Sequence, residues 1–299
     1  HIWNWDAWAS KTIKPPMTVG HEFMGEIVDV GSSVKNLSLG DRVSAESHIV
    51  GSTSRNARSG KLHLDPDTIN VGVNRDGAFA EFLCVPSRNV IKLPGSVDNE
   101  MGAILDPYGN AVHAALSFDL VGEDVLITGA GPIGIMSAAI ALHVGARKVL
   151  ITDINDDRLS LVKSVCDVET LNPSKENLKE KMKHMGLKEG FDIGLEMSGS
   201  ESALDQMIDS MLMGGKVALL GLPSDSINLD LPKLIFKALT LKAIYGREMF
   251  ETWYKGLALI ESGLDVTNVI THSFHFTEYE KAFELLNAGK AGKVVLNWD

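Results

Sequence analysis

The chain contains very little cysteine. Only Cys84 and Cys166 occur among its 299 residues. Two cysteines are too few for a disulfide framework or a four-cysteine zinc site, so we expect a reducing compartment and a cytoplasmic location. An excess of basic residues is also missing, because the formal net charge is -11. The charge balance therefore favours neither nucleic acid nor an anionic membrane surface as a partner.

Long hydrophobic runs are absent as well. The longest apolar stretch covers only Ile133 to Leu142. A membrane-spanning helix needs about 20 apolar residues, so this stretch predicts a helix in a protein core. The chain opens at His1 rather than at a methionine, and we expect residues to precede it.

The order of apolar patterns predicts an α/β fold. The first hundred residues contain short strand-like segments at 23–30, 41–44 and 78–85, together with a polar, irregular loop at 48–70. From Asp106 onward, helical and strand-like segments alternate, which is typical of βαβ units and a doubly wound parallel sheet. The predicted strands are 124–128, 148–153, 193–196, 216–221 and 239–245, and the predicted helices include 111–118, 131–143 and 156–164.

The last fifty residues return to a mixed pattern. A helix is predicted at 250–262 and another at 278–288, each followed by a strand, at 269–274 and 293–298. We expect this end to pack with the β-rich first part as a second domain. The predicted divisions are residues 1–112 and 251–299 for that domain and 113–250 for the α/β domain.

A glycine-rich turn marks the α/β part as a dinucleotide site. Gly129, Gly131 and Gly134 follow a predicted strand directly and open an apolar helix. The first glycine permits a tight turn, the second lets the backbone approach a pyrophosphate, and the third lets helix and strand pack closely. The pyrophosphate would bind at the helix N-terminus, where free N–H groups and the helix dipole favour anions. This is the Rossmann fingerprint.

The next strand ends in an acid that favours NAD. Asp153 lies 19 residues beyond Gly134, where a carboxylate accepts hydrogen bonds from a ribose and repels a 2′-phosphate. Arg158 could neutralise such a phosphate, or it could be a charge on the helix surface. The alternative reading of the whole pattern is a glycine turn beside a surface aspartate.

Further candidates lie outside the glycine turn. Leu220, Gly221 and Leu222 follow a later predicted strand, at the sheet edge where ligands of such folds bind. His21 and Glu22 offer the nitrogen and oxygen ligands that a zinc ion accepts. Asp106 could orient a group bound to that metal, or it could simply cap a helix.

These segments together resemble the zinc-containing medium-chain dehydrogenases. The resemblance covers essentially the whole chain and rests on VGHEFMGEIV, VGVNRDGAFAEF, LDPYGNAVHAALSFDLVGEDVL and the Rossmann block. The segments HIWNWDAWASKTI and IYGREMFETWYK are more particular to the branch that oxidises L-threonine. The resemblance implies a GroES-like catalytic domain, incomplete at its N-terminus, a Rossmann domain and a homotetramer. It also implies NAD-dependent, zinc-assisted oxidation of the 3-hydroxyl of L-threonine to 2-amino-3-oxobutyrate.

The resemblance assigns roles to positions of this chain. His21 and Glu22 match two ligands of a catalytic zinc, and His1 matches a histidine that passes the substrate proton to solvent. Asp106 matches an acid that supports activity without binding the metal. The remaining matches are contacts of NAD: Ile133, Asp153, Arg158, Leu220, Gly221, Leu222, Ile244 and Tyr245.

Two departures from the family concern its metal sites. The family's zinc cysteine lies in a Cys-Gly-Thr-Asp-x-His motif, and this chain starts at the histidine. Either upstream residues supply that cysteine or the catalytic site is incomplete. The family's structural zinc uses four cysteines, and no structural zinc is expected here because the matching positions are Gly51, Ser54, Ala57 and Asp65.

Three hypotheses remain at this stage. The first is an active dehydrogenase whose complete chain supplies the missing cysteine. The second is a catalytically impaired NAD-binding homologue in which His21 and Glu22 are relics. The third, a zinc-free reductase, is disfavoured because His21, Glu22 and Asp106 are all present.

Overall fold

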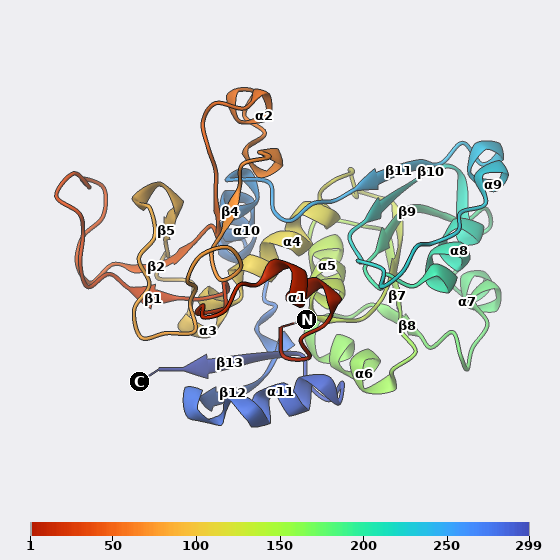
Figure 1. Ribbon diagram of the computed structural model, residues 1–299. Coiled ribbons are helices and arrows are strands. Elements are labelled where there is room, and N and C mark those ends of the chain that lie inside the picture. The colour runs from red at the N-terminus through yellow and green to blue at the C-terminus, as the bar shows by residue number, and fades with distance from the viewer. Residues whose placement is uncertain (1, 299) are drawn as a thin grey trace.

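A six-stranded parallel sheet forms the centre of the α/β part of the molecule. The computed structural model describes residues 2–298. The strand order is β11-β10-β9-β6-β7-β8, so the chain winds outward in both directions from the neighbours β6 and β9 (Figure 1). The doubly wound α/β fold predicted from the sequence is therefore confirmed. The strands are β6 (Asp124–Thr128), β7 (Lys148–Thr152), β8 (Glu169–Leu171), β9 (Phe191–Glu196), β10 (Met211–Leu219) and β11 (Thr240–Ala243).

Both faces of this sheet are covered by helices. Successive side chains of a strand point to opposite faces, and along β6 Val125 and Ile127 join one apolar cluster while Leu126 joins another. A strand buried on both faces needs a continuous apolar run, which is why DVLIT contains no alternation. The helices are α5 (Pro132–His143), α6 (Asp156–Val165), α7 (Leu178–His184), α8 (Glu201–Ser210) and α9 (Leu231–Phe236).

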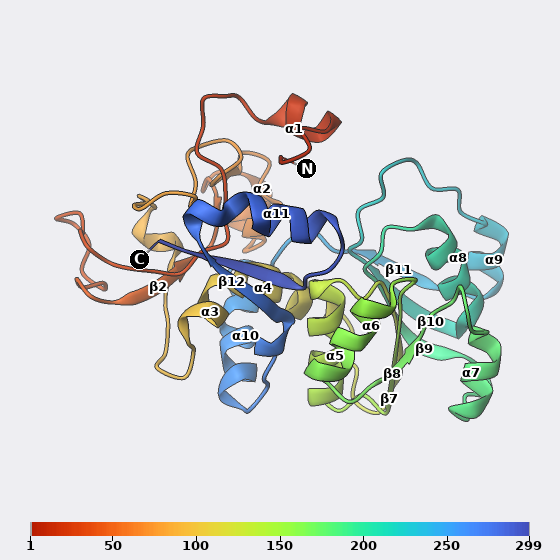
Figure 2. The same ribbon diagram turned by 90° about the horizontal axis from the view of Figure 1, so that it is seen from below.

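The N-terminal and C-terminal parts of the chain pack against each other beside the parallel sheet (Figures 1 and 2). Trp3 stacks on Phe283 with ring centroids 4.7 Å apart, and Phe79 lies 6.0 Å from the ring of Trp298. The N-terminal elements are α1 (Ala7–Thr12), β1 (Gly25–Glu26), β2 (Arg42–Ala45), β3 (His48–Ile49), α2 (Arg55–Arg58), β4 (Ile69–Asn70), β5 (Val90–Lys92) and α3 (Asn99–Ala103). The C-terminal elements are α10 (Glu251–Glu261), β12 (Ile270–His275), α11 (Tyr279–Asn287) and β13 (Lys293–Asn297).

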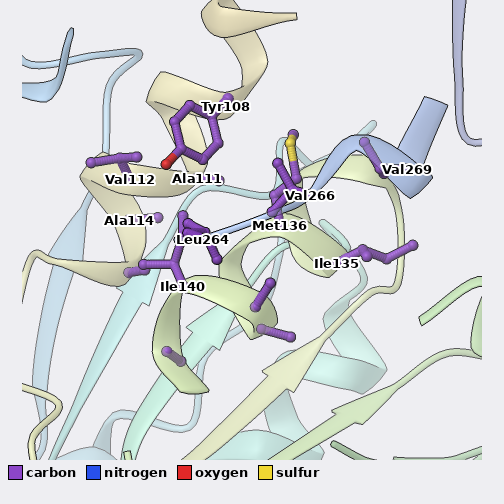
Figure 3. Close-up of a cluster of buried hydrophobic side chains, with 14 of the residues drawn as sticks. Tyr108, Ala111, Val112, Ala114, Ile135, Met136, Ile140, Leu264, Val266 and Val269 are labelled. Atoms are coloured by element: carbon purple, nitrogen blue, oxygen red, sulfur yellow. The ribbon is translucent and has the colours of Figure 1, made fainter. Parts of the chain in front are cut away.

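Helix α4 (Leu105–Ala115) joins the two parts. It packs between α5 and α10, and its side chains meet those of α5 and the 264–269 segment in one buried cluster (Figure 3). The hydroxyl of Tyr108 donates to the carbonyl of Gly256 on α10 at 3.0 Å. Because α4 runs through residue 112, the first predicted domain division falls inside a helix. The domain divisions themselves stay a prediction.

Most predicted elements from residue 124 onward are confirmed within a few residues. The strand predicted at 78–85 is wrong, because this segment forms no ladder. The amides of Ala78 and Phe79 donate instead to the carbonyls of Gly20 and Val19, at 2.8 and 2.9 Å, and Phe82 is exposed. The strand predicted at 23–30 shrinks to β1, and the predicted helix at 111–118 begins earlier, at Leu105.

The segment 48–70 carries more structure than its polar sequence predicts. It contains β3, α2, β4 and a single 3-10 turn, Leu62–Leu64. Within residues 2–298, none of the helices has the length and apolar character needed to cross a bilayer.

Candidate cofactor and catalytic site

The glycine turn after β6 has the geometry of a phosphate-binding loop. Gly129 has a φ of +93°, which favours glycine, and a Cβ on Gly134 would lie 2.0 Å from the carbonyl oxygen of Gly129. A Cβ on Gly131 would meet nothing within 4 Å, although this residue caps α5. Two glycines are thus required by the fold. The third leaves open space in front of the free N–H groups of a helix, where an anion is stabilised.

Asp153 ties this turn to the end of β7. Its Oδ2 accepts from the amide of Ala130 at 2.8 Å, and its Oδ1 accepts from the amide of Asn155 at 2.9 Å. The guanidinium of Arg158 lies 3.6 Å from the same carboxylate. Arg158 is therefore paired with the acid. A carboxylate oxygen has two lone-pair directions, so Oδ1, which accepts from one amide, retains one for a further donor.

A second turn brings the later candidates to the same sheet edge. A Cβ on Gly221 would lie 2.3 Å from the amide nitrogen of Gly199, in the loop after β9. The amide of Ile244 donates to the carbonyl of Leu219 at 2.9 Å. Leu222 and Tyr245 expose their side chains beside these buried turns. The predicted cofactor contacts therefore follow the carboxyl ends of the strands on both sides of the β6–β9 pair, where the strand order reverses, which is the usual ligand position in such sheets.

The predicted metal ligands occupy the loop before β1. Glu22 forms an ion pair with Lys293 of β13. The pKa of Glu22 lies below its ordinary value: burial raises it, and the Lys293 ammonium together with His21 and Arg247 lowers it by more. The carboxyl of Asp106, from α4, feels the charges of both His21 and Glu22. The fold thus brings Asp106 of α4 near the loop that carries His21 and Glu22.

Asp106 belongs to a buried ion cluster that sequence reasoning missed. Arg247 forms an ion pair with Asp106, and it also donates to both carboxylate oxygens of Glu46, at 2.6 and 3.1 Å. The three side chains are 5% exposed or less. Ser47 bridges the cluster, since its hydroxyl donates to Asp106 at 3.3 Å and accepts from Arg247 at 2.9 Å.

Two aromatic groups complete this cluster. The indole N–H of Trp253 donates to Glu46 at 2.8 Å, and the Nδ1 atom of His48 lies 2.7 Å from the same carboxylate. Arg247 and Trp253 both lie in the GREMFETWYK segment, whose distinctive sequence was the available signal. Glu46 and His48 follow β2 and carry no spacing pattern that sequence reasoning could have used.

Opposite effects act on the carboxylates of the cluster. Burial raises the pKa of Glu46, but the Arg247 guanidinium and His48 lower it by a larger amount, so the net shift is downward. For Asp106, burial is the larger effect and raises the pKa, although Arg247 opposes it. Burial lowers the pKa of Arg247, and the two carboxylates more than offset this. The Arg247 guanidinium therefore pairs with both Glu46 and Asp106, and the carboxylate form of Asp106 is the less well stabilised of the two.

The donors present suit zinc in kind but not in number. His21 and Glu22 supply an imidazole nitrogen and a carboxylate oxygen, which zinc binds. Across residues 2–298, no group of three or more histidine, cysteine, aspartate or glutamate side chains is arranged to hold a metal ion. The proton-relay candidate His1 lies outside the described residues.

Two family profiles match the chain. The alcohol dehydrogenase GroES-like domain matches residues 1–95, and the zinc-binding dehydrogenase profile matches residues 132–262. Among solved structures, alcohol dehydrogenase TADH from Thermus sp. ATN1 is similar, with a TM-score of 0.88 and 28% identity. That likeness covers 96% of this chain and 86% of the Thermus chain.

Curated relatives match over the full chain. Proteins named L-threonine 3-dehydrogenase from Ruegeria pomeroyi and Aeromonas salmonicida are each 57% identical to it over 299 residues. Each match covers 100% of this chain and 87% of the relative.

Proposed function

The chain belongs to the zinc-containing medium-chain dehydrogenases, and from this premise we propose that it is an NAD-dependent L-threonine 3-dehydrogenase. The reaction oxidises the 3-hydroxyl of L-threonine to the ketone of 2-amino-3-oxobutyrate. A hydride leaves C3 for the nicotinamide, the hydroxyl loses a proton, and NAD becomes NADH. The observation that carries this proposal is the 57% identity to two proteins of that name along the entire chain.

The sheet edge supplies the cofactor site in this proposal. The N–H groups that open α5 bind the pyrophosphate in the space beside Gly131, and Asp153 accepts from the adenosine ribose. Arg158 holds Asp153 in place through their ion pair. Ile133, Leu220 to Leu222, Ile244 and Tyr245 contact the rest of the dinucleotide.

The catalytic side is formed by the loop before β1 and the first turn of α4. A zinc ion held by His21, Glu22 and a further ligand would act as a Lewis acid toward the substrate oxygen. Asp106 lies beside this pair without binding the metal and supplies negative charge, while Arg247 fixes its orientation. His1 passes the substrate proton to solvent.

A second candidate function is NAD binding without turnover. The observation that favours it is the ion pair between Glu22 and Lys293, which occupies the carboxylate that a metal would need. Combined with the two-donor set among the described residues, this pair points to an impaired metal site.

Metal analysis and turnover separate the two candidates. The purified protein is assayed for bound zinc and for NADH formation with L-threonine. One zinc per chain and threonine-dependent NADH formation support the dehydrogenase. NAD binding by calorimetry with neither zinc nor turnover would overturn it and support the second candidate.

We extend the proposal to a homotetramer in the cytoplasm. β11 ends the sheet with one edge unpaired and mostly exposed side chains. Large apolar side chains nearby, on Ile235 and Phe236 of α9 and on Leu222, are also exposed. Such a surface suits burial against another subunit. Light scattering after size-exclusion chromatography measures the mass, and a monomer at micromolar concentration contradicts this part.

A further inference from the structure

A cavity of about 500 Å³ lies between the 56–70 segment and Tyr245. Its walls include His63, Asp65 and Asn70, and none of His21, Glu22 and Asp106 lines it. The cavity therefore differs from the proposed catalytic site, although it adjoins a proposed cofactor contact through Tyr245.

Polar atoms without partners are concentrated in this wall. Among the described residues, seven buried side-chain nitrogen or oxygen atoms have no hydrogen-bond partner. Four of them belong to residues that line the cavity: both carboxylate oxygens of Asp65, the Nδ1 atom of His63 and the Oδ1 atom of Asn70. Asp65 is only 6% exposed. A buried carboxylate is strongly disfavoured unless a positive group or hydrogen-bond donors meet it. Asp65 therefore lacks the donor or cation that its carboxylate needs.

The residues around Asp65 do not form a metal site. Asp65 lies where the resemblance places the last cysteine of a four-cysteine zinc site, but Gly51, Ser54 and Ala57 at the other positions offer no side-chain ligand of that kind. A Cβ on Gly51 would already come within 3.2 Å of Asp65 Oδ2. No metal-binding group is found among residues 2–298.

The cavity wall offers acceptors and a negative charge. Burial and the neighbouring His113 lower the pKa of His63, so its imidazole is neutral at pH 7 and one ring nitrogen can accept. Asp65 and Asn70 contribute further acceptor oxygens. The exposed ring of Tyr245 adds an aromatic wall of the kind that attracts organic cations.

We propose that this cavity binds a small organic molecule through its primary ammonium group, with the N–H groups donating to Asp65 and to the acceptors of His63 and Asn70. A charge-assisted hydrogen bond to a buried carboxylate is the strong contact of this site. The volume is large enough for an organic cation. The site requires neither NAD nor zinc, so its test is independent of the dehydrogenase activity.

Calorimetry with n-butylammonium chloride tests the proposal on the full chain without NAD or zinc. The matched variants are Asp65→Asn and Asp67→Asn, because Asp67 is an exposed aspartate of the same segment. We expect the wild type and Asp67→Asn to bind alike and Asp65→Asn to bind at least about tenfold more weakly. Tetramethylammonium, which has the charge but no N–H donors, should also bind at least about tenfold more weakly.

Several results would overturn the proposal. They are absence of n-butylammonium binding by the wild type, equal affinity in Asp65→Asn, and equal affinity for tetramethylammonium. Thermal unfolding guards against a folding defect: without ligand, Asp65→Asn should be no less stable than the wild type, and n-butylammonium should raise only the wild-type Tm. If Asp65→Asn does not fold, Asn70→Ala keeps the carboxylate and should weaken binding by a few fold. Unchanged affinity in that variant then counts against the site.

Discussion

Replacing Arg247 with methionine removes the only cation that contacts both Glu46 and Asp106 among the described residues. In the wild type, its guanidinium binds Glu46 through two N–H groups, at 2.6 and 3.1 Å, and pairs with Asp106 through a third. Methionine fills much of the volume but carries no charge. The substitution therefore leaves two buried carboxylates without the guanidinium that they share.

The magnitude follows from the burial of the cluster. Breaking a buried ion pair by removing one partner costs about 3–5 kcal/mol, because the remaining charge is left uncompensated. This is a large part of a typical unfolding free energy of about 5–15 kcal/mol. At about 2–4 °C per kcal/mol for a chain of this size, the Tm should fall by about 6–20 °C.

Thermal and urea unfolding measure this effect. Lys281→Met is the control, since Lys281 pairs with Glu278 on the exposed surface, where a pair contributes about 0–1 kcal/mol. Adding Glu46→Gln to Arg247→Met removes one of the stranded charges and should restore part of the lost stability. A loss below 1 kcal/mol in Arg247→Met, or no recovery in the double variant, would refute the reasoning about the buried charges.

Four further predictions concern the cofactor loop and the pH response. Gly134→Ala should destabilise the fold and weaken NAD binding, because its Cβ would lie 2.0 Å from a carbonyl oxygen. Gly131→Ala should unfold like the wild type but lose at least about tenfold in NAD affinity, since the methyl fills the space meant for the pyrophosphate; normal affinity contradicts that placement. Asp153→Ser should lower the ratio of kcat/KM for NAD to that for NADP, because it removes the repelling charge and frees Arg158; an unchanged ratio speaks against both assignments. The folded-state pKa of Glu46 lies below its ordinary 4.5, so its contribution is present above that pH and lost as the pH falls. The difference in unfolding free energy between the wild type and Glu46→Gln should therefore shrink on acidification below pH 4.5, and a difference that grows there would show the opposite sign.

Local sequence signals predicted the α/β part well. The run DVLIT, the glycine spacing and the acid of Asp153 all act within one βαβ unit, where each residue's role depends on its near neighbours. The prediction failed at 78–85, where β-branched and aromatic residues indicated a strand. There the chain is held by single backbone bonds to Gly20 and Val19, and such long-range contacts leave no periodic pattern.

The catalytic side was only partly predictable for the same reason. His21, Glu22 and Asp106 were recognised by residue type and resemblance. Glu46 and Arg247 are 201 positions apart, and their contact exists only because the segment after β11 returns to the N-terminal part. Nothing local in the residues around Glu46 signals a buried arginine as its partner.

The segment that leaves β11 links the two halves of the site thermodynamically. Tyr245, at the proposed cofactor contact, stands two residues before Arg247, whose guanidinium is locked to Asp106 and Glu46. A ligand that shifts this short stretch of backbone must also work against the buried ion pairs. If a ligand near Asp106 changes the affinity for the dinucleotide by some factor, the dinucleotide changes the affinity for that ligand by the same factor. Cooperativity between the two ligands, and a preferred order of loading, would then arise from three consecutive residues of the chain without any motion of whole domains.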